Sequence, residues 1–104
     1  MKAAKSQDKV KKNTAGETYI FYLFIYGNEP KSVLARKNLD QICQEYLADR
    51  CQIETIDVLE DFEEALKNNI YVTPALIKLC PEPRMAVFGS LSDKEKVLSA
   101  LNLR

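Results

Sequence analysis

The residues best suited to chemistry in this chain of 104 residues are three cysteines, Cys43, Cys51 and Cys80. No two of them have the C-x-x-C spacing of a redox or zinc motif, and an odd number argues against a disulfide framework. We therefore expect Cys43 and Cys51 to be small buried apolar side chains that form no disulfide. Cys80 begins a Pro-rich turn, Cys80-Pro81-Glu82-Pro83, where a thiol can be exposed and reactive.

Other catalytic groups are scarce. The chain contains no histidine, which excludes imidazole metal ligands, Ser-His triads and His-activated thiols. Asp57 and Glu60 could form a pair of catalytic carboxylates, but an acidic residue between a strand and a helix more often caps the helix. We therefore predict that the chain is not an enzyme and that it binds no cofactor and no metal.

The amino-acid composition limits the kinds of partner that this chain can bind. The formal net charge is zero, so the chain offers no broad basic surface for nucleic acid. The longest apolar run, residues 19–26, is far shorter than the ~20 residues of a membrane-spanning helix, and no signal peptide is apparent. We expect a cytoplasmic protein without nucleic-acid or membrane partners. Residues 1–17, which carry five lysines, predict a flexible basic tail before a domain over residues 18–104.

The first half of the domain predicts a strand, a helix and a second strand. Residues 18–26 are β-branched or aromatic almost throughout, which is typical of a strand covered on both faces. Asn28 can cap the helix that follows, and Pro30 suits its first turn. The helix is expected over residues 31–47. Residues 51–58 mix apolar and polar side chains, as edge strands do, and a right-handed crossover makes the two strands parallel.

The second half predicts a short helix, a hairpin and a terminal helix. Residues 60–69 form the short helix, with Phe62, Ala65 and Leu66 directed inward. Residues 75–79 and 84–88 are the strands of a hairpin. Ser92 and Glu95 have the spacing of a capping box at the start of the terminal helix. The remaining lysines, arginines and aspartates are expected on solvated surfaces.

The order strand, helix, strand, helix, strand, strand, helix, with Pro74 just before the third strand, resembles that of thioredoxin-like domains. Their hallmark proline is cis, which makes Pro74 the candidate for a structural cis-proline. The place of their C-x-x-C is occupied here by Gly27-Asn28-Glu29-Pro30. Residues 23–32, 56–59 and 72–98 together resemble the KaiB family. The expected fold is therefore α/β, a mixed four-stranded sheet with helices on both faces.

The resemblance to KaiB implies an adaptor that binds a KaiC-like hexameric ATPase and modulates its phosphorylation state or signalling output. It places the partner-binding surface on the edge strand and the adjoining helix, at Leu34, Cys51, Gln52 and Glu54. Clock members of the family present a basic side chain near Glu54 and carry an acidic extension where this chain stops, so we expect weaker binding to KaiC here. The alternative is a thioredoxin-like protein with a redox or stress-response role independent of KaiC, with Cys80 as its thiol.

The family also implies two possible folds, a thioredoxin-like form and a rearranged tetrameric ground state. The balance is expected to depend on Ala100 and Asn102, which replace a glycine and an aspartate of the family's usual terminal segment. Alanine is favoured over glycine in a helix by ~1 kcal/mol, and loss of a carboxylate near a helix C-terminus removes repulsion with the helix dipole. We therefore predict the thioredoxin-like form, with residues 93–103 helical. A homo-oligomer, dimer or tetramer, is the further partner that the family implies.

Overall fold

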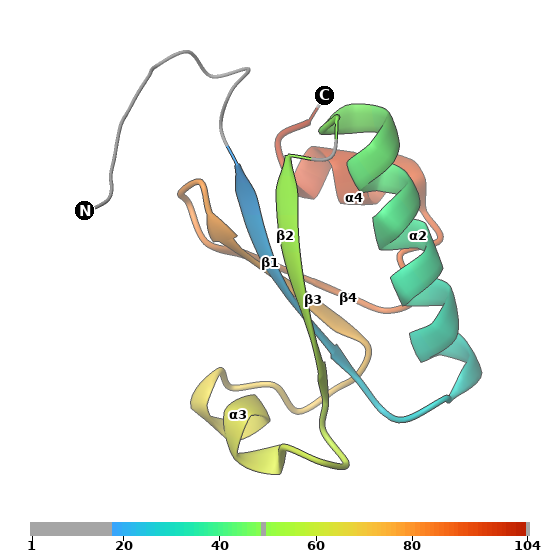
Figure 1. Ribbon diagram of the computed structural model, residues 1–104, viewed down its shortest axis with the longest axis vertical. Coiled ribbons are helices and arrows are strands. Elements are labelled where there is room, and N and C mark those ends of the chain that lie inside the picture. The colour runs from blue at the N-terminus through green and yellow to red at the C-terminus, as the bar shows by residue number, and fades with distance from the viewer. Residues whose placement is uncertain (1–17, 49, 104) are drawn as a thin grey trace.

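A computed structural model describes residues 18–48 and 50–103. Four strands form one mixed sheet in the order β2-β1-β3-β4 (Figure 1). The strands are β1 (Tyr19–Ile25), β2 (Cys51–Asp57), β3 (Ala75–Cys80) and β4 (Met85–Phe88), and the helices are α2 (Pro30–Tyr46), α3 (Phe62–Lys67) and α4 (Lys94–Ala100). This is the predicted thioredoxin-like arrangement, and the predicted fold class is confirmed.

The first strand lies at the centre of the sheet because its side chains are apolar on both faces. β1 pairs parallel with β2 and antiparallel with β3, and β3 pairs antiparallel with β4 in the predicted hairpin. Phe21 and Leu23 are buried on one face of β1, and Phe24 is buried on the other. β2 lies at an edge, as its mixed composition predicted.

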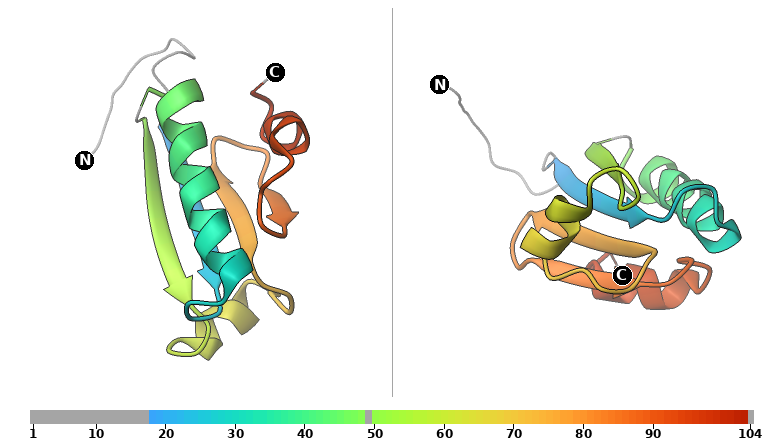
Figure 2. Two further views of the ribbon diagram at one scale, coloured as in Figure 1. Left: turned by 90° about the vertical axis from the view of Figure 1, so that its right-hand side faces the viewer. Right: turned by 90° about the horizontal axis from the view of Figure 1, so that it is seen from below.

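The long helix α2 and the short helix α4 cover one face of the sheet, and the short helix α3 covers part of the other (Figure 2). Among the described residues, fourteen buried apolar side chains form the core beneath α2 and α4. Six form the core beneath α3. The face beneath α2 and α4 is called the covered face, and the face that carries α3 is called the open face.

The start of α2 differs from the prediction. Pro30 is its first residue, as expected, but the N-cap is Glu29 rather than Asn28, and no side chain caps it. The buried Ser32 makes a different contact, because its Oγ accepts a 3.0 Å hydrogen bond from the backbone N–H of Tyr26. This bond ties the end of β1 to the first turn of the helix.

The terminal helix is shorter than predicted and is capped by a different residue. Asp93, not Ser92, is the N-cap, and its Oδ1 accepts a 3.3 Å bond from the N–H of Lys96. The Ser92 hydroxyl instead lies 2.7 Å from that of Ser90. The capping box was therefore wrong by one residue, because the aspartate that follows Ser92 is itself a good cap.

α3 and α4 end in the same way. Asn69 and Asn102 have positive φ angles of 59° and 61°. After each, a backbone N–H reaches back five residues, from Ile70 to the carbonyl of Ala65 and from Leu103 to that of Leu98. This is a Schellman motif, in which Asn or Gly accepts the left-handed conformation at least cost. Helix α4 therefore stops at Ala100, and the expectation of helix throughout residues 93–103 was too long.

One lysine contradicts the expectation that the charged residues are solvated. Lys78 on β3 is only 2% exposed. It lies opposite Phe21 of β1, and its ammonium nitrogen is 5.8 Å from the centre of the Tyr19 ring. An apolar stem can pack in a core while the charged head meets the π-face of an aromatic ring, which the sequence pattern did not reveal.

The peptide bonds before Pro74, Pro81 and Pro83 are cis. In the part of the chain that the structure describes, no helix is long and apolar enough to cross a membrane. The predicted tail of residues 1–17 lies outside the described residues.

Candidate functional site

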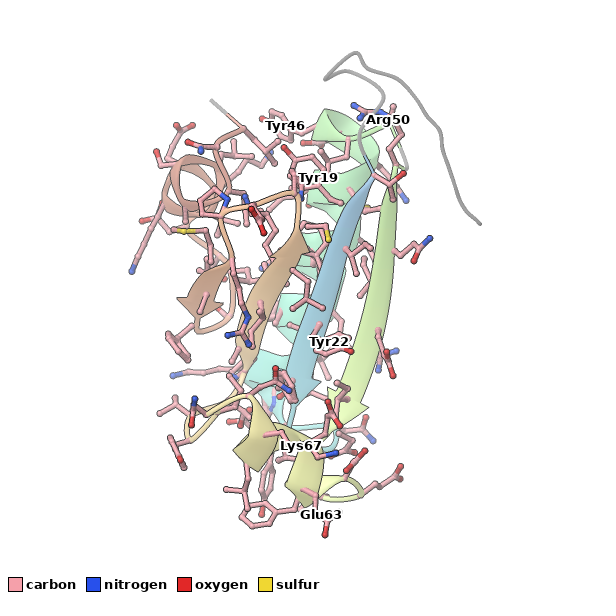
Figure 3. The ribbon with its side chains drawn as sticks, turned by 90° about the vertical axis from the view of Figure 1, so that its left-hand side faces the viewer. Tyr19, Tyr22, Tyr46, Arg50, Glu63 and Lys67 are labelled. Atoms are coloured by element: carbon pink, nitrogen blue, oxygen red, sulfur yellow. A yellow bond between two sulfur atoms is a disulfide. The ribbon has the colours of Figure 1, made fainter. Side chains whose placement is uncertain are left out.

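The sheet register places the predicted partner-binding residues of β2 on different faces. Glu54 lies beside Tyr22, Tyr22 beside Ile77, and Ile77 beside Ala86, so these four residues form a row across the open face. Tyr22 is at the middle of that face in Figure 3. Because side chains alternate along a strand, Gln52 shares this face with Glu54, and both are exposed. Cys51 points to the other face, where it packs against the core beneath α2.

Leu34 is exposed near the start of α2. That helix starts near the end of β1, at the end of the molecule where the parallel strands finish (Figure 1), and Leu34 is its fifth residue. Cys51 lies at the opposite end of the molecule, where it meets Cys43. Cys43 is nine residues after Leu34 in α2, which is about 13 Å along the helix axis. The four predicted residues therefore do not form one cluster, although β2 runs from the end of the molecule that holds Cys51 to the end that holds Leu34.

Cys43 and Cys51 lie together as a disulfide pair, with their Cα atoms 6.5 Å apart. This corrects the prediction that they form no disulfide. The loop after α2 brings the start of β2 back against the last turns of the helix, which spacing alone did not reveal. The prediction that the chain is not an enzyme relied on the lack of a C-x-x-C motif and of histidine, and the pair contradicts it, because these two cysteines meet without that motif. The pair does not by itself indicate an enzyme.

The end of β1, where redox thioredoxins carry their cysteines, is organised by a carboxylate instead. Asp57 Oδ1 accepts 3.0 Å hydrogen bonds from the backbone N–H groups of Gly27 and Leu59. Gly27 has a φ angle of 53°, and a Cβ there would lie 3.1 Å from the Leu59 side chain, so both conformation and space favour glycine. Asp57 thus holds two loops together, and Asp61 is the residue that caps α3. Cys80 is exposed at the end of β3.

Six large apolar side chains are exposed around this end of the molecule, and we call them the apolar rim. They belong to the loop after β1, to the two loops that flank α3 and to α3 itself: Tyr26, Leu59, Phe62, Leu66, Tyr71 and Val72. Phe62 and Leu66 are 63% and 43% exposed, and Tyr71 is 75% exposed. The prediction that Phe62 and Leu66 point inward was wrong, because Ala65 is the residue of α3 that is buried against the sheet.

A hollow of about 240 Å³ lies within the rim, with Tyr26, Phe62 and Tyr71 among its walls. Contiguous exposed apolar surface of this kind is typical of a binding site. The rim was not predicted from the sequence. The signal that could have revealed it is the density of apolar residues in segments too short or irregular to bury them, such as Tyr71 and Val72 before Pro74.

An ion pair joins the two helices of the covered face. Lys94 Nζ lies 3.0 Å from Glu45 Oε1 and 5.7 Å from the centre of the Tyr46 ring. The hydrogen bond from Lys94 lowers the pKa of the Glu45 carboxyl below its ordinary value, and a bond from Gln41 adds to this. The same contact raises the pKa of Lys94. Elsewhere in residues 18–48 and 50–103, no cluster of three acidic or cysteine side chains could hold a metal ion.

The fold and site define a thioredoxin-like domain without thiols at the usual redox position. The N-terminal domain of Synechococcus elongatus SasA has a similar structure, with a TM-score of 0.68 at 20% identity, over 93% of this chain and 95% of that one. The Deadhead thioredoxin of Drosophila melanogaster has a TM-score of 0.65 at 16% identity, over 85% of this chain and 82% of that one. Both likenesses show the fold.

Sequence comparison gives the family. Residues 22–103 match the KaiB domain. The chain is 43% identical to circadian clock protein KaiB3 of Synechocystis sp. over 84 residues, which are 81% of this chain and 82% of that protein. It is 40% identical to the circadian clock oscillator protein KaiB of Gloeothece citriformis over 91 residues, which are 88% of this chain and 86% of that protein. The chain belongs to the KaiB family.

Proposed function

We propose that this protein docks on a KaiC-type hexameric ATPase and modulates its phosphorylation state or signalling output. Membership of the KaiB family supports the choice of partner. The observation that carries the proposal is the apolar rim, because it offers a protein partner a large contact area that is already exposed.

The composition of the rim suits a protein interface. Aromatic side chains dominate the binding energy of many interfaces, since they bury much surface at a small cost in conformational entropy. The rim has three of them, Tyr26, Phe62 and Tyr71. Leu34 lies at the same end of the molecule and extends this surface on the side of α2.

The edge strand leads directly into the rim. β2 runs from Cys51 to Asp57 and continues through Val58 to Leu59, a member of the rim. As the outer strand of the sheet it has a strand neighbour on one side only, which leaves backbone groups for a partner. The exposed Gln52 and Glu54 flank this edge on the open face, so the charge of Glu54 contributes to the choice of partner.

The test is association with the KaiC-type ATPase encoded in the same genome and with a clock KaiC, measured by calorimetry at matched ionic strength. Glu54→Lys should tighten binding to the clock KaiC by about three- to tenfold, because it restores a basic side chain at the edge. The gain should shrink as salt is added. Light scattering on the free protein tests the dimer or tetramer that the family implies.

The control is Glu82→Lys, which makes the same charge change at an exposed position between β3 and β4, on the side of the sheet away from β2. Glu45 is unsuitable, because a substitution there also breaks the contact with Lys94. Equal affinities for the wild type and Glu54→Lys would remove Glu54 from the interface. Absence of any complex with either ATPase would overturn the proposed function.

A further inference from the structure

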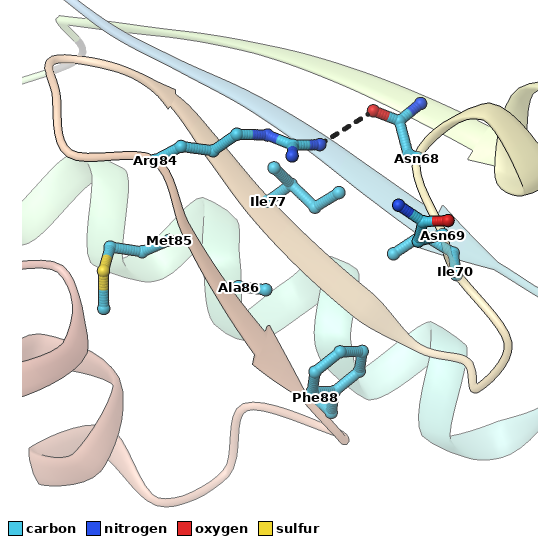
Figure 4. A pocket seen from close by; sticks show the side chains of 8 residues that line it. All are labelled: Asn68, Asn69, Ile70, Ile77, Arg84, Met85, Ala86 and Phe88. Carbon is cyan, nitrogen blue, oxygen red and sulfur yellow. Dashed lines mark hydrogen bonds between the residues drawn. The ribbon is translucent and has the colours of Figure 1, made fainter.

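A second hollow, of about 330 Å³, lies on the open face, between the end of α3 and the β3–β4 hairpin (Figure 4). Its volume is at the lower end of the range for pockets that hold small molecules. It is separate from the hollow within the apolar rim, with which it shares only Ile70. The proposed docking on an ATPase does not use it.

One side of the hollow is polar and held in place. The Arg84 guanidinium donates a 2.9 Å hydrogen bond to Asn68 Oδ1. Asn68 is itself fixed, because its Nδ2 donates a 2.9 Å bond to the backbone carbonyl of Glu64 in the preceding turn. A guanidinium has five N–H donors in a planar fork, so this contact leaves others for a ligand. The Asn69 side chain lies on the same side of the hollow (Figure 4).

The rest of the hollow is apolar. Ile77 and Ala86, neighbours across the hairpin, form its floor. Phe88, which is 52% exposed, forms one wall. An exposed phenyl ring beside small aliphatic side chains provides a surface on which a flat apolar group can stack.

The charge of the hollow selects the kind of ligand. Arg84 is the only charged residue among the eight that line it, and none of the eight is acidic. A single guanidinium beside an amide matches one carboxylate, which it can hold with two parallel hydrogen bonds. We propose that this hollow binds a small carboxylate with a flat apolar body, in which the carboxylate meets Arg84 and the body lies between Phe88 and Ile77.

The test uses phenylacetate as the probe and two-dimensional NMR of the full chain. Phenylacetate should shift the backbone signals of Ile70, Ile77, Ala86 and Phe88, saturating with a dissociation constant on the order of 1 mM. Phenylacetamide, which has the same ring but no charge, should bind at least about tenfold more weakly. Arg84→Gln should reduce the affinity for phenylacetate by a similar factor and leave that for phenylacetamide unchanged.

Two variants guard against indirect effects. Arg36→Gln removes an exposed cation from α2, on the other side of the sheet, and should leave binding unchanged. Asn68→Ala frees the Arg84 side chain without removing its charge, and should weaken binding less than Arg84→Gln does. The proposal would be overturned by absence of shifts at 10-fold the expected constant (about 10 mM), by shifts confined to other residues, or by equal affinities for the charged and uncharged probes. None of these results bears on binding to the ATPase.

Discussion

The two faces of the sheet are built from the same four strands but are covered very differently. Beneath α2 and α4, large side chains such as Phe21 and Leu98 are fully buried, and the Glu45–Lys94 ion pair joins the two helices across the surface. On the open face, α3 has six residues and buries only Ala65. Phe62, Tyr71 and Phe88 remain exposed there.

The covered face therefore contributes mainly to stability, and the open face is available for binding. The covered face supplies most of the buried apolar area, which is the main favourable contribution to folding. The open face leaves apolar area in water, which a partner or a ligand can cover. A small domain can keep such a surface exposed only if the rest of its core is well packed.

The largest expected difference between the two faces is in the loss of stability when one phenylalanine on each face is replaced by alanine. Phe21 is 0% exposed beneath α2, whereas Phe88 is half exposed on the open face. Phe21→Ala should lower the free energy of unfolding by ~3–5 kcal/mol, because it removes a buried ring and leaves a cavity. Phe88→Ala should cost only about 1 kcal/mol. Urea denaturation measures both, and equal losses would show that the two faces contribute alike.

A smaller effect is expected at the end of α4. Restoring Gly at Ala100 and Asp at Asn102 should cost roughly 1–2 kcal/mol, since glycine is a poor helix former and a carboxylate is unfavourable at a helix C-terminus. We expect this to shift the population towards the rearranged fold, which NMR detects as loss of helical shifts in residues 94–100.

Asn69→Asp is the matched control, because Asn69 has the same left-handed conformation at the end of α3. It should lower stability slightly and leave α4 helical. If the double variant also leaves α4 helical, residues 100 and 102 do not set the balance between the folds.

The main elements of the fold were predictable because each has a strong local pattern. The apolar run at residues 19–26 predicted a central strand, and Pro30 predicted the start of α2. Capping was less predictable, since Ser92 and Asp93 are both good caps and only the backbone path decides between them. Asn102 was chosen for its effect on the helix dipole, yet the structure shows it as the left-handed residue that ends the helix.

The candidate site was harder to predict because it depends on contacts between distant segments. Cys43 and Cys51 meet only once β2 has folded back along α2. The apolar rim combines residues from three loops and the short helix α3. From its type alone, each of these residues would be expected in the hydrophobic core. The burial of Lys78 depends on its pairing beside Phe21 and on the ring of Tyr19.

The smallest expected effect concerns the ion pair of the covered face. The pKa of Glu45 is lowered in the folded protein, so its contribution to stability is present above the ordinary glutamate pKa of 4.5 and is lost as the pH falls through the lowered value. The raised pKa of Lys94 gives a contribution that is present below the ordinary lysine pKa of 10.5 and is lost as the pH rises through the folded value.

Glu45→Gln should remove both contributions. The difference in melting temperature between wild type and variant should therefore be greatest near neutral pH, small throughout because both groups are exposed, and reduced by salt. A difference that persists at pH 2 would mean that Glu45 acts through packing rather than charge.

Hydrogen–deuterium exchange of the complex with a KaiC-type ATPase tests the division between the two faces most directly. The outer edge of β2 and the apolar rim, at Tyr26 and within residues 51–72, should gain protection when the ATPase is bound. Residues 94–100 of α4 should exchange at the same rate in the free and bound protein. Protection confined to α4, or to the β3–β4 hairpin, would contradict the assignment of binding to the edge of β2 and the rim.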